Sequence, residues 1–266
     1  MKQLYSLIVS WMKKSLPEPI VSLLRRIPAA YYSIRGWSPC HEPEMQLVSR
    51  LASTRGTAID IGANTGVYTE YLAQLFNAVY AFEPQSKLCG ERLVPLGHKY
   101  GNIYTYSVAL SDHAGMQTLF VPVSGDGHSR FQNDMASLTN HGYWDRWSID
   151  SVEREVSISL LDTFEIPDVT FIKIDVEGHE LAVIRGAKAT IARYKPVMLV
   201  EIQNRLLDET TTVDDVVHEI ESLGYDAYFM YMGGLMPYRY FRYKQMQHLD
   251  APRWVRGIDN FYFIPR

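Results

Sequence analysis

The sequence predicts an α/β fold with a mostly parallel sheet that is covered by helices on both faces. Short apolar runs alternate with amphipathic stretches between residues 57 and 110, and the alternation returns between residues 169 and 223. Strands separated by one helix each are typical of parallel sheets that are buried on both faces. With 266 residues, 47% of them hydrophobic and 21% charged, the chain is long enough for one large domain or one domain with an appendage.

The first part of this alternation begins with the apolar run Thr57–Asp60, which leads into a glycine-containing turn. After the turn, large apolar side chains recur at helical spacing over Val67–Phe76. The next three elements are expected to be a strand, a helix and a strand, at Ala78–Phe82, Ser86–Tyr100 and Ile103–Leu110.

The middle of the chain, at about residues 112–156, loses this alternation, and we interpret it as an insertion. It contains the strand-like run Gln117–Val123 and two tryptophans, Trp144 and Trp147. The aromatic-rich end from Tyr225 to Ile264 is typical of strands joined by a glycine turn. Between the insertion and this end we expect a strand, a helix, a strand and a helix at Val169–Asp175, Glu180–Tyr194, Val197–Ile202 and Val213–Leu223.

The charge is unevenly distributed, and this predicts a boundary near residue 50. Residues 1–35 carry six basic side chains and one acidic side chain, whereas the whole chain has a net charge of −4. We expect residues 1–50 to form a basic helical arm or cap, and residues 51–266 to form the main domain. The arm either packs on the main domain, which we favour, or lies on an anionic membrane surface.

Composition excludes several classes of protein. A net charge of −4 provides no field for non-specific nucleic-acid binding. The two cysteines, Cys40 and Cys89, exclude a disulfide framework and a cysteine-based zinc site. The apolar run at residues 4–12 is too short to span a bilayer and is not followed by a small-residue cleavage site. We therefore expect a cytoplasmic protein, at most peripheral to the inner face of the membrane.

The segment Asp60–Gly66 has the composition of a ligand-binding turn between a strand and a helix. Gly62 would let the backbone approach a ligand, and Gly66 would let the following helix pack on the sheet. Glu83 ends the second strand 23 residues after Asp60, close to the spacing of an acid that binds ribose hydroxyls. These features favour a cofactor that contains a nucleoside.

The glycine spacing distinguishes between two cofactors. The turn lacks the middle glycine of the dinucleotide motif, which lets the backbone approach a pyrophosphate. A cofactor with ribose and adenine but no phosphate, and with a cationic centre near Asp60, fits better: S-adenosylmethionine. An NAD(P)-dependent oxidoreductase remains the alternative, because it would also explain Asp60 and Glu83.

Between about residues 57 and 204 the sequence resembles the FkbM-family methyltransferases. This resemblance implies a Rossmann-like class I methyltransferase fold whose seven-stranded sheet ends in a reversed strand. It also implies methyl transfer from S-adenosylmethionine to a hydroxyl of a small molecule or glycan, with Asn64 in the cofactor turn and Ala109 and Asp112 beside the adenine. The resemblance rests on Asp60–Gly66, Ala81–Pro84, Ala109–Asp112, Ser137-Leu138, Leu161-Asp162, Phe171–Gly178 with Glu180, Gly186 and Leu199–Ile202.

A second group of titratable residues, Asp175, Glu177, His179 and Glu180, follows the fourth strand. Asp175 should lie at the same sheet edge as Asp60. An alcohol acceptor needs a base, and the pKa of histidine suits that role, so we interpret His179 as the base. The rival hypotheses assign the proton to Glu177 or Glu180, or to a divalent cation that they hold, although we assign no metal ligand.

A third class of function is a non-catalytic adaptor of a glycan-assembly complex, docked through the basic arm. The presence of Asp175 and His179 together argues against it, since an inactive protein does not require both. The sequence predicts neither an oligomeric state nor the identity of the acceptor.

Overall fold

The computed structural model describes residues 44–123, 136–139, 150–208, 210–231, 234–242, 246–247 and 257–266. The chain divides into two compact units, Met1–Gln46 and Leu47–Arg266. Apart from helix α4 (Met45–Leu51), the predicted arm or cap lies outside the described residues. No described helix has the length and apolar character needed to cross a membrane.

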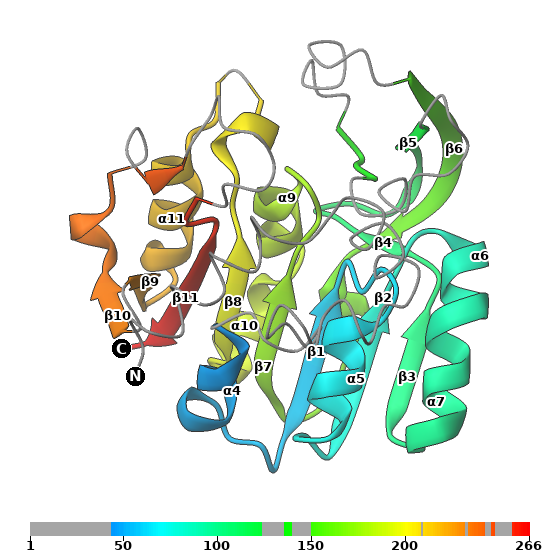
Figure 1. The fold of residues 1–266 in the computed structure, drawn as a ribbon, viewed down its shortest axis with the longest axis horizontal. Coiled ribbons are helices and arrows are strands. Elements are labelled where there is room, and N and C mark those ends of the chain that lie inside the picture. The colour runs from blue at the N-terminus through cyan, green and yellow to red at the C-terminus, as the bar shows by residue number, and fades with distance from the viewer. Residues whose placement is uncertain are drawn as a thin grey trace, which may run out of the picture. The chain divides into compact units, whose positions relative to one another are not determined.

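The second unit is built on a mixed central sheet (Figure 1), which has eight strands among the described residues, in the order β10-β9-β11-β8-β7-β1-β2-β3. The five strands from β8 to β3 are parallel, and β11, β9 and β10 pair antiparallel. The strands are β1 (Thr57–Ile61), β2 (Ala78–Phe82), β3 (Ile103–Tyr106), β7 (Val169–Ile174), β8 (Val197–Glu201), β9 (Tyr225–Tyr231), β10 (Gly234–Pro237) and β11 (Asn260–Pro265).

The predicted mostly parallel sheet that ends in a reversed strand is confirmed, but the predicted number of seven strands is wrong. The additional strand is β10, which begins at Gly234 and pairs antiparallel with β9 at the edge of the sheet. The reversed strand at the end of the chain is β11, which lies between β8 and β9, and the added strand β10 runs in the same direction as β11.

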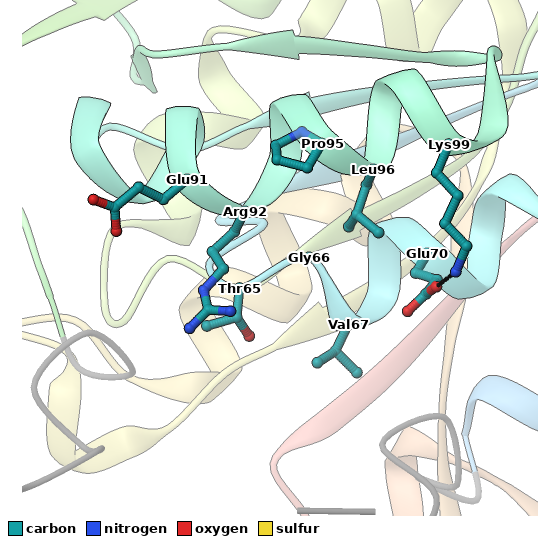
Figure 2. Close-up of a pocket in the computed structure, with 9 residues that line it drawn as sticks. All are labelled: Thr65, Gly66, Val67, Glu70, Glu91, Arg92, Pro95, Leu96 and Lys99. Carbon is teal, nitrogen blue, oxygen red and sulfur yellow. Dashed lines mark hydrogen bonds and ion pairs between the residues drawn. The ribbon is translucent and has the colours of Figure 1, made fainter.

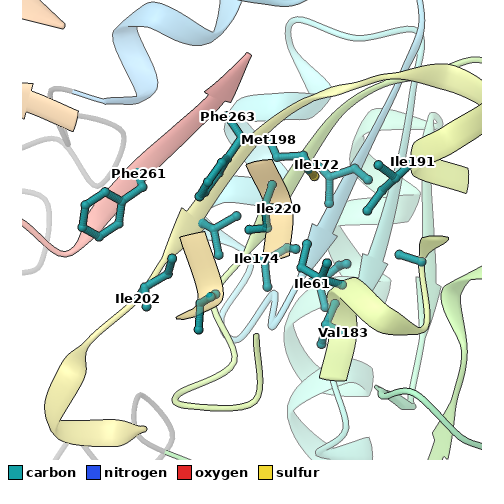
Figure 3. Close-up of a cluster of buried hydrophobic side chains, with 14 of the residues drawn as sticks. Ile61, Ile172, Ile174, Val183, Ile191, Met198, Ile202, Ile220, Phe261 and Phe263 are labelled. Atoms are coloured by element: carbon teal, nitrogen blue, oxygen red, sulfur yellow. The ribbon is translucent and has the colours of Figure 1, made fainter. Parts of the chain in front are cut away.

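Helices cover both faces of the sheet (Figure 1). On one face, aliphatic side chains of alternate strand residues pack against the apolar sides of α9, α10 and α11, and form the large core in Figure 3. On the opposite face lies α5, and Phe76 just after it stacks on Phe171 of β7. The helical elements are α5 (Val67–Ala73), α6 (Ser86–Leu88), the π-helical segment η1 (Cys89–Leu93), α7 (Val94–Tyr100), α9 (Glu180–Arg185), α10 (Lys188–Tyr194) and α11 (Val213–Ser222).

Two predicted helices are interrupted, each for a local reason. The helix expected at Ser86–Tyr100 widens into η1 just before Pro95, which has no N–H to donate to the carbonyl four residues earlier. The helix expected at Glu180–Tyr194 breaks at Gly186. A Cβ at Gly186 would lie 1.9 Å from the Ser111 carbonyl oxygen, so the break accommodates the loop that carries Ser111.

The strand predicted at Ile103–Leu110 is two strands in two sheets. Its second part, β4 (Ala109–Leu110), pairs with β6 (Asp150–Ser159), which pairs antiparallel with β5 (Gly115–Val123). Among the described residues these three strands form a second sheet with its own small apolar core. The predicted insertion therefore contributes most of the second sheet. Trp144 and Trp147 lie outside the described residues.

The contact at Gly186 predicts that Gly186→Ala destabilises the protein. The added methyl group must displace the Ser111 backbone, and overpacking of this kind costs about 1–3 kcal/mol. Gly90→Ala is the matched control, because a Cβ at Gly90 meets nothing within 4 Å and should increase the stability by about 0.5–1 kcal/mol. Urea unfolding of both variants measures the difference. An unchanged unfolding midpoint for Gly186→Ala would contradict the prediction.

Candidate functional site

The candidate site lies at the carboxyl ends of β1, β2 and β7. Asp60 is the last residue but one of β1, and Glu83 and Asp175 directly follow β2 and β7. β1 pairs in parallel with both β2 and β7, so the three strands end at one edge. The strand order also reverses at β1, because β2 follows on one side and β7 lies on the other. Open α/β sheets bind ligands at such a reversal.

Asp60 is almost completely buried, with 1% of its surface exposed. Its Oδ2 accepts a hydrogen bond from Thr69 Oγ1 of α5 at 2.5 Å. Burial raises the pKa of Asp60 to about 6, the Thr69 bond and Lys173 oppose this rise, and the nearby Asp175 adds to it. The fold therefore holds a carboxylate at the sheet edge that gains from a cation beside it.

Glycine is required at positions 62 and 66 of the turn, but for reasons other than those expected from the sequence. Gly62 has φ +81°, and a Cβ there would lie 1.8 Å from the Asp175 carbonyl oxygen, so the close approach is to protein backbone. Gly66, with φ +84°, begins α5, and a Cβ there would press on Leu93 and Leu96 of the neighbouring helical segment. Gly62 thus joins two loops of the site, and Gly66 lets two helices approach each other.

Glu83 is 4% exposed, and each of its carboxylate oxygens accepts a backbone N–H. The Asn64 N–H donates to Oε2 at 3.0 Å, and the Gln85 N–H donates to Oε1 at 2.9 Å. Asn64 reaches this position in the left-handed region, with φ 51°. The Gln85 side chain also donates to this carboxylate. A carboxylate has about four acceptor positions, so one remains for a ribose hydroxyl. Burial raises the pKa of Glu83 to about 7.

His179 and Asp112 belong to one cluster, connected by Ser111. The Ser111 Oγ lies 2.9 Å from His179 Nε2 and 3.4 Å from Asp112 Oδ1. Burial lowers the pKa of His179, so its imidazole is neutral near pH 7 and able to accept a proton. Asp112 is more exposed, and the hydrogen bond with His113, at 2.7 Å, lowers the pKa of Asp112.

Glu177 and Glu180 shape the turn that carries His179. Glu180 is buried, its Oε1 accepts the Gly178 N–H at 2.9 Å, and burial raises its pKa to about 7. Glu177 and Gly178 both have positive φ, and the Glu177 carbonyl accepts a hydrogen bond from Ser137 Oγ at 2.6 Å. This bond attaches the turn to the loop beside the second sheet.

Two predictions about the site remain: the place of Ala109 beside the adenine, and the binding of a divalent cation. Ala109 belongs to β4, and its side chain packs in the small core of the second sheet. Within the described part of the chain, no three or more His, Cys, Asp or Glu side chains are grouped so that they could hold a metal ion.

A pocket of about 290 Å³ lies between α5 and the helical segment η1–α7 (Figure 2). Its lining includes Thr65 and Gly66 of the turn, and the ion pair between Glu70 and Lys99, at 2.7 Å, crosses one end of it. The lining does not include Asp60, Glu83 or Asp175, so this pocket is separate from the sheet edge that carries them.

Two residues of the site were not identified from the sequence. Lys173 ends up fully buried beside Asp175, and the signal for it is a single lysine inside the apolar run of the fourth predicted strand. Ser111 carries no comparable signal, because its role depends on a contact with His179, 68 residues away.

The residues at the sheet edge fit S-adenosylmethionine. Glu83 retains acceptor capacity for a ribose hydroxyl, and Asp60 is a buried carboxylate that a cationic group would favour. No step of this fit requires a pyrophosphate site, in agreement with the glycine spacing.

Comparison with known proteins supports the same conclusion. Residues 60–227 match the family model described as Methyltransferase FkbM domain. This match confirms the predicted family and, with it, S-adenosylmethionine as the methyl donor. No curated protein sequence gives a significant match.

Among solved structures, an FkbM methyltransferase from Methylobacillus flagellatus KT is similar over 88% of this chain and 52% of its own, with 15% identity and a TM-score of 0.47. The chain thus spans about half the length of that protein. A TehB-like SAM-dependent methyltransferase from Corynebacterium glutamicum is similar over 93% of this chain and 100% of its own, with 10% identity and a TM-score of 0.43.

We predict that Glu83→Ala weakens the binding of S-adenosylhomocysteine by about 1.5–3 kcal/mol, the usual contribution of hydrogen bonds to a charged group. Glu91→Ala is a suitable control, because Glu91 lies on η1 in the separate pocket. Titration calorimetry measures both affinities. Unchanged affinity in Glu83→Ala would remove Glu83 from the cofactor site.

The raised pKa values also predict how the stability of the ligand-free protein depends on pH. Burial raises the pKa of Glu83 from 4.5 to about 7, so the native state binds more protons than the unfolded state between these values. The free energy of unfolding should therefore fall as the pH rises from about 4.5 to 7. Thermal unfolding at pH 5 and pH 8 measures this fall, which Glu83→Gln should reduce. An equal fall in that variant would contradict the assignment.

Proposed function

Because the chain belongs to the FkbM family of methyltransferases, we propose that it methylates a hydroxyl group of a sugar, glycan or natural product. S-Adenosylmethionine supplies the methyl group when it is bound. A new C–O bond forms as the C–S bond breaks, and the hydroxyl proton passes to a base of the protein. S-Adenosylhomocysteine leaves, so that atoms and charge balance.

The observation that carries this proposal is the His179–Ser111 pair. His179 is substantially buried, its imidazole is neutral near pH 7, and its Nε2 lies 2.9 Å from Ser111 Oγ. Ser111 fixes the orientation of the ring, as a catalytic histidine requires. His179 directly precedes α9, in the turn that follows Asp175, so the base follows the strand end that borders the cofactor turn.

The other residues of the site are proposed to bind S-adenosylmethionine and to orient it toward the acceptor. Glu83 would accept a hydrogen bond from the ribose, and Asp60 would stabilise the cationic end of the cofactor. Ala109 and Asp112 are assigned to the adenine side on the family pattern. Alignment of the two reactants contributes a large share of the rate of a displacement of this kind.

Location and partners are part of the same proposal. We place the enzyme in the cytoplasm, with a small-molecule or glycan acceptor and without nucleic acid as a partner, on the basis of its net charge and cysteine content. The basic residues within 1–35 would provide peripheral membrane contact, although we favour a role for this arm in capping the main domain.

The test is a transfer assay with a labelled methyl group against a panel of glycans and nucleotide sugars. We expect a methyl ether, which resists alkaline hydrolysis, whereas a methyl ester would be cleaved. His179→Ala should lower kcat by about 10²–10⁴-fold with little change in KM or cofactor affinity. His218→Ala, which removes an exposed histidine of α11, is the matched control.

The rival base is Glu177 or Glu180, alone or with a divalent cation. A His179→Ala enzyme within threefold of the parent rate would support that rival, as would activity that is lost in EDTA and restored by magnesium. Stabilisation by NAD in place of S-adenosylhomocysteine would contradict methyl transfer itself.

A further inference from the structure

Lys173 is a charged side chain in the interior of the central sheet. It lies in β7 between Ile172 and Ile174, and none of its surface is exposed. Transfer of an ammonium group from water to a protein interior is costly unless the charge is paired. The roles assigned above to the residues of the site do not use this lysine.

The position of Lys173 is defined by three elements. Its Nζ lies 3.2 Å from Asp175 Oδ2, just after the same strand, and 4.9 Å from the ring centroid of Tyr68 on α5. In the parallel pairing of β7 with β1, Lys173 is the register partner of Asp60. The ammonium group therefore belongs to the same face of the sheet as α5, at the point where the strand order reverses.

The titratable groups around this position are mostly acidic. Asp60 interacts electrostatically with Lys173 of β7 and with Asp175 in the loop after β7. It also interacts with Glu83 after β2, and it accepts a hydrogen bond from the Thr69 hydroxyl of α5. Asp175 in turn interacts with Glu180 of α9. Among these described groups that interact with Asp60, Lys173 carries the positive charge.

We propose that Lys173 is a positioning residue that keeps Asp60 ionised and orients Asp175, so that the crevice presents a negative charge to the cationic end of S-adenosylmethionine. One ammonium group beside two carboxylates leaves a net negative charge. Without it, the buried Asp60 carboxylate would face the partly exposed Asp175 with no cation beside it, and Asp60 would bind a proton more readily. This inference rests on the proposed use of Asp60 toward the cofactor.

The experiment follows the Asp60 carboxyl directly. Protein labelled with ¹³C at aspartate carboxyl groups is titrated by NMR, and Asp60→Asn assigns the signal. In Lys173→Met we expect the Asp60 midpoint to move upward by about one pH unit or more, since a nearby opposite charge favours the ionised form by about 1–3 units. Lys188→Met is the control, because it removes an exposed lysine that is 3.0 Å from Glu219, and it should leave the midpoint unchanged.

Cofactor affinity is the second readout. Calorimetry should show S-adenosylmethionine binding to Lys173→Met about five- to tenfold more weakly than to the parent at pH 6, with the difference disappearing by pH 9. A purely structural lysine would lower the melting temperature and leave both the midpoint and this pH dependence unchanged, and that result would overturn the proposal.

Two further measurements keep the outcome clear. If Lys173→Met does not fold, Asp175→Asn tests the same charge balance: removal of the like charge should move the Asp60 midpoint downward, and no movement would refute the proposal. If Asp60→Asn binds the cofactor as tightly as the parent does, the assigned use of Asp60 fails. A shifted midpoint in Lys173→Met would then still show that Lys173 controls its charge.

Discussion

The close approach of two backbone segments at Gly62 is the constraint on which the rest of the site depends. The Asp175 carbonyl lies where the Cβ of any other residue would be, and the Asp175 N–H donates to the Ile61 carbonyl at 3.0 Å. These contacts join the ends of β1 and β7. They bring Asp60, Lys173 and Asp175 into one set of interacting charges, which neither loop could assemble alone.

Burial of three carboxyl groups in and around the site favours ligand binding at the expense of the stability of the ligand-free protein. Asp60, Glu83 and Glu180 are each less than 5% exposed, and burial raises the pKa of each. Hydrogen bonds from backbone N–H groups partly offset the cost of burying the charges of Glu83 and Glu180, and the hydrogen bond from the Thr69 hydroxyl does the same for Asp60. Preformed carboxylates in a site of low dielectric constant interact strongly with an incoming cation. The ligand-free protein is correspondingly less stable at neutral pH than its packing alone would allow.

Much of the fold could be predicted because period and spacing are local properties. The strand expected at Ala78–Phe82 is observed with the same bounds, and Glu83 follows it as predicted, while Asp60 lies one residue before the end of β1. The errors arise where tertiary contacts override local pattern. The break at Gly186 depends on the Ser111 carbonyl, and the eighth strand depends on pairing with β9. Ser111 and Lys173 gain their roles from His179 and Asp175, and a pattern of residue types does not contain such contacts.

The hydrogen bond from Ser137 to the Glu177 carbonyl determines which side chains the turn before α9 depends on. The acceptor is a main-chain oxygen, so the bond requires only a hydroxyl at position 137 and places no demand on the side chain at 177. Substitutions of the side chain at position 177 leave this acceptor in place, so the turn that carries His179 keeps its anchor. Position 137, in contrast, is where the loss of one hydroxyl would release that turn.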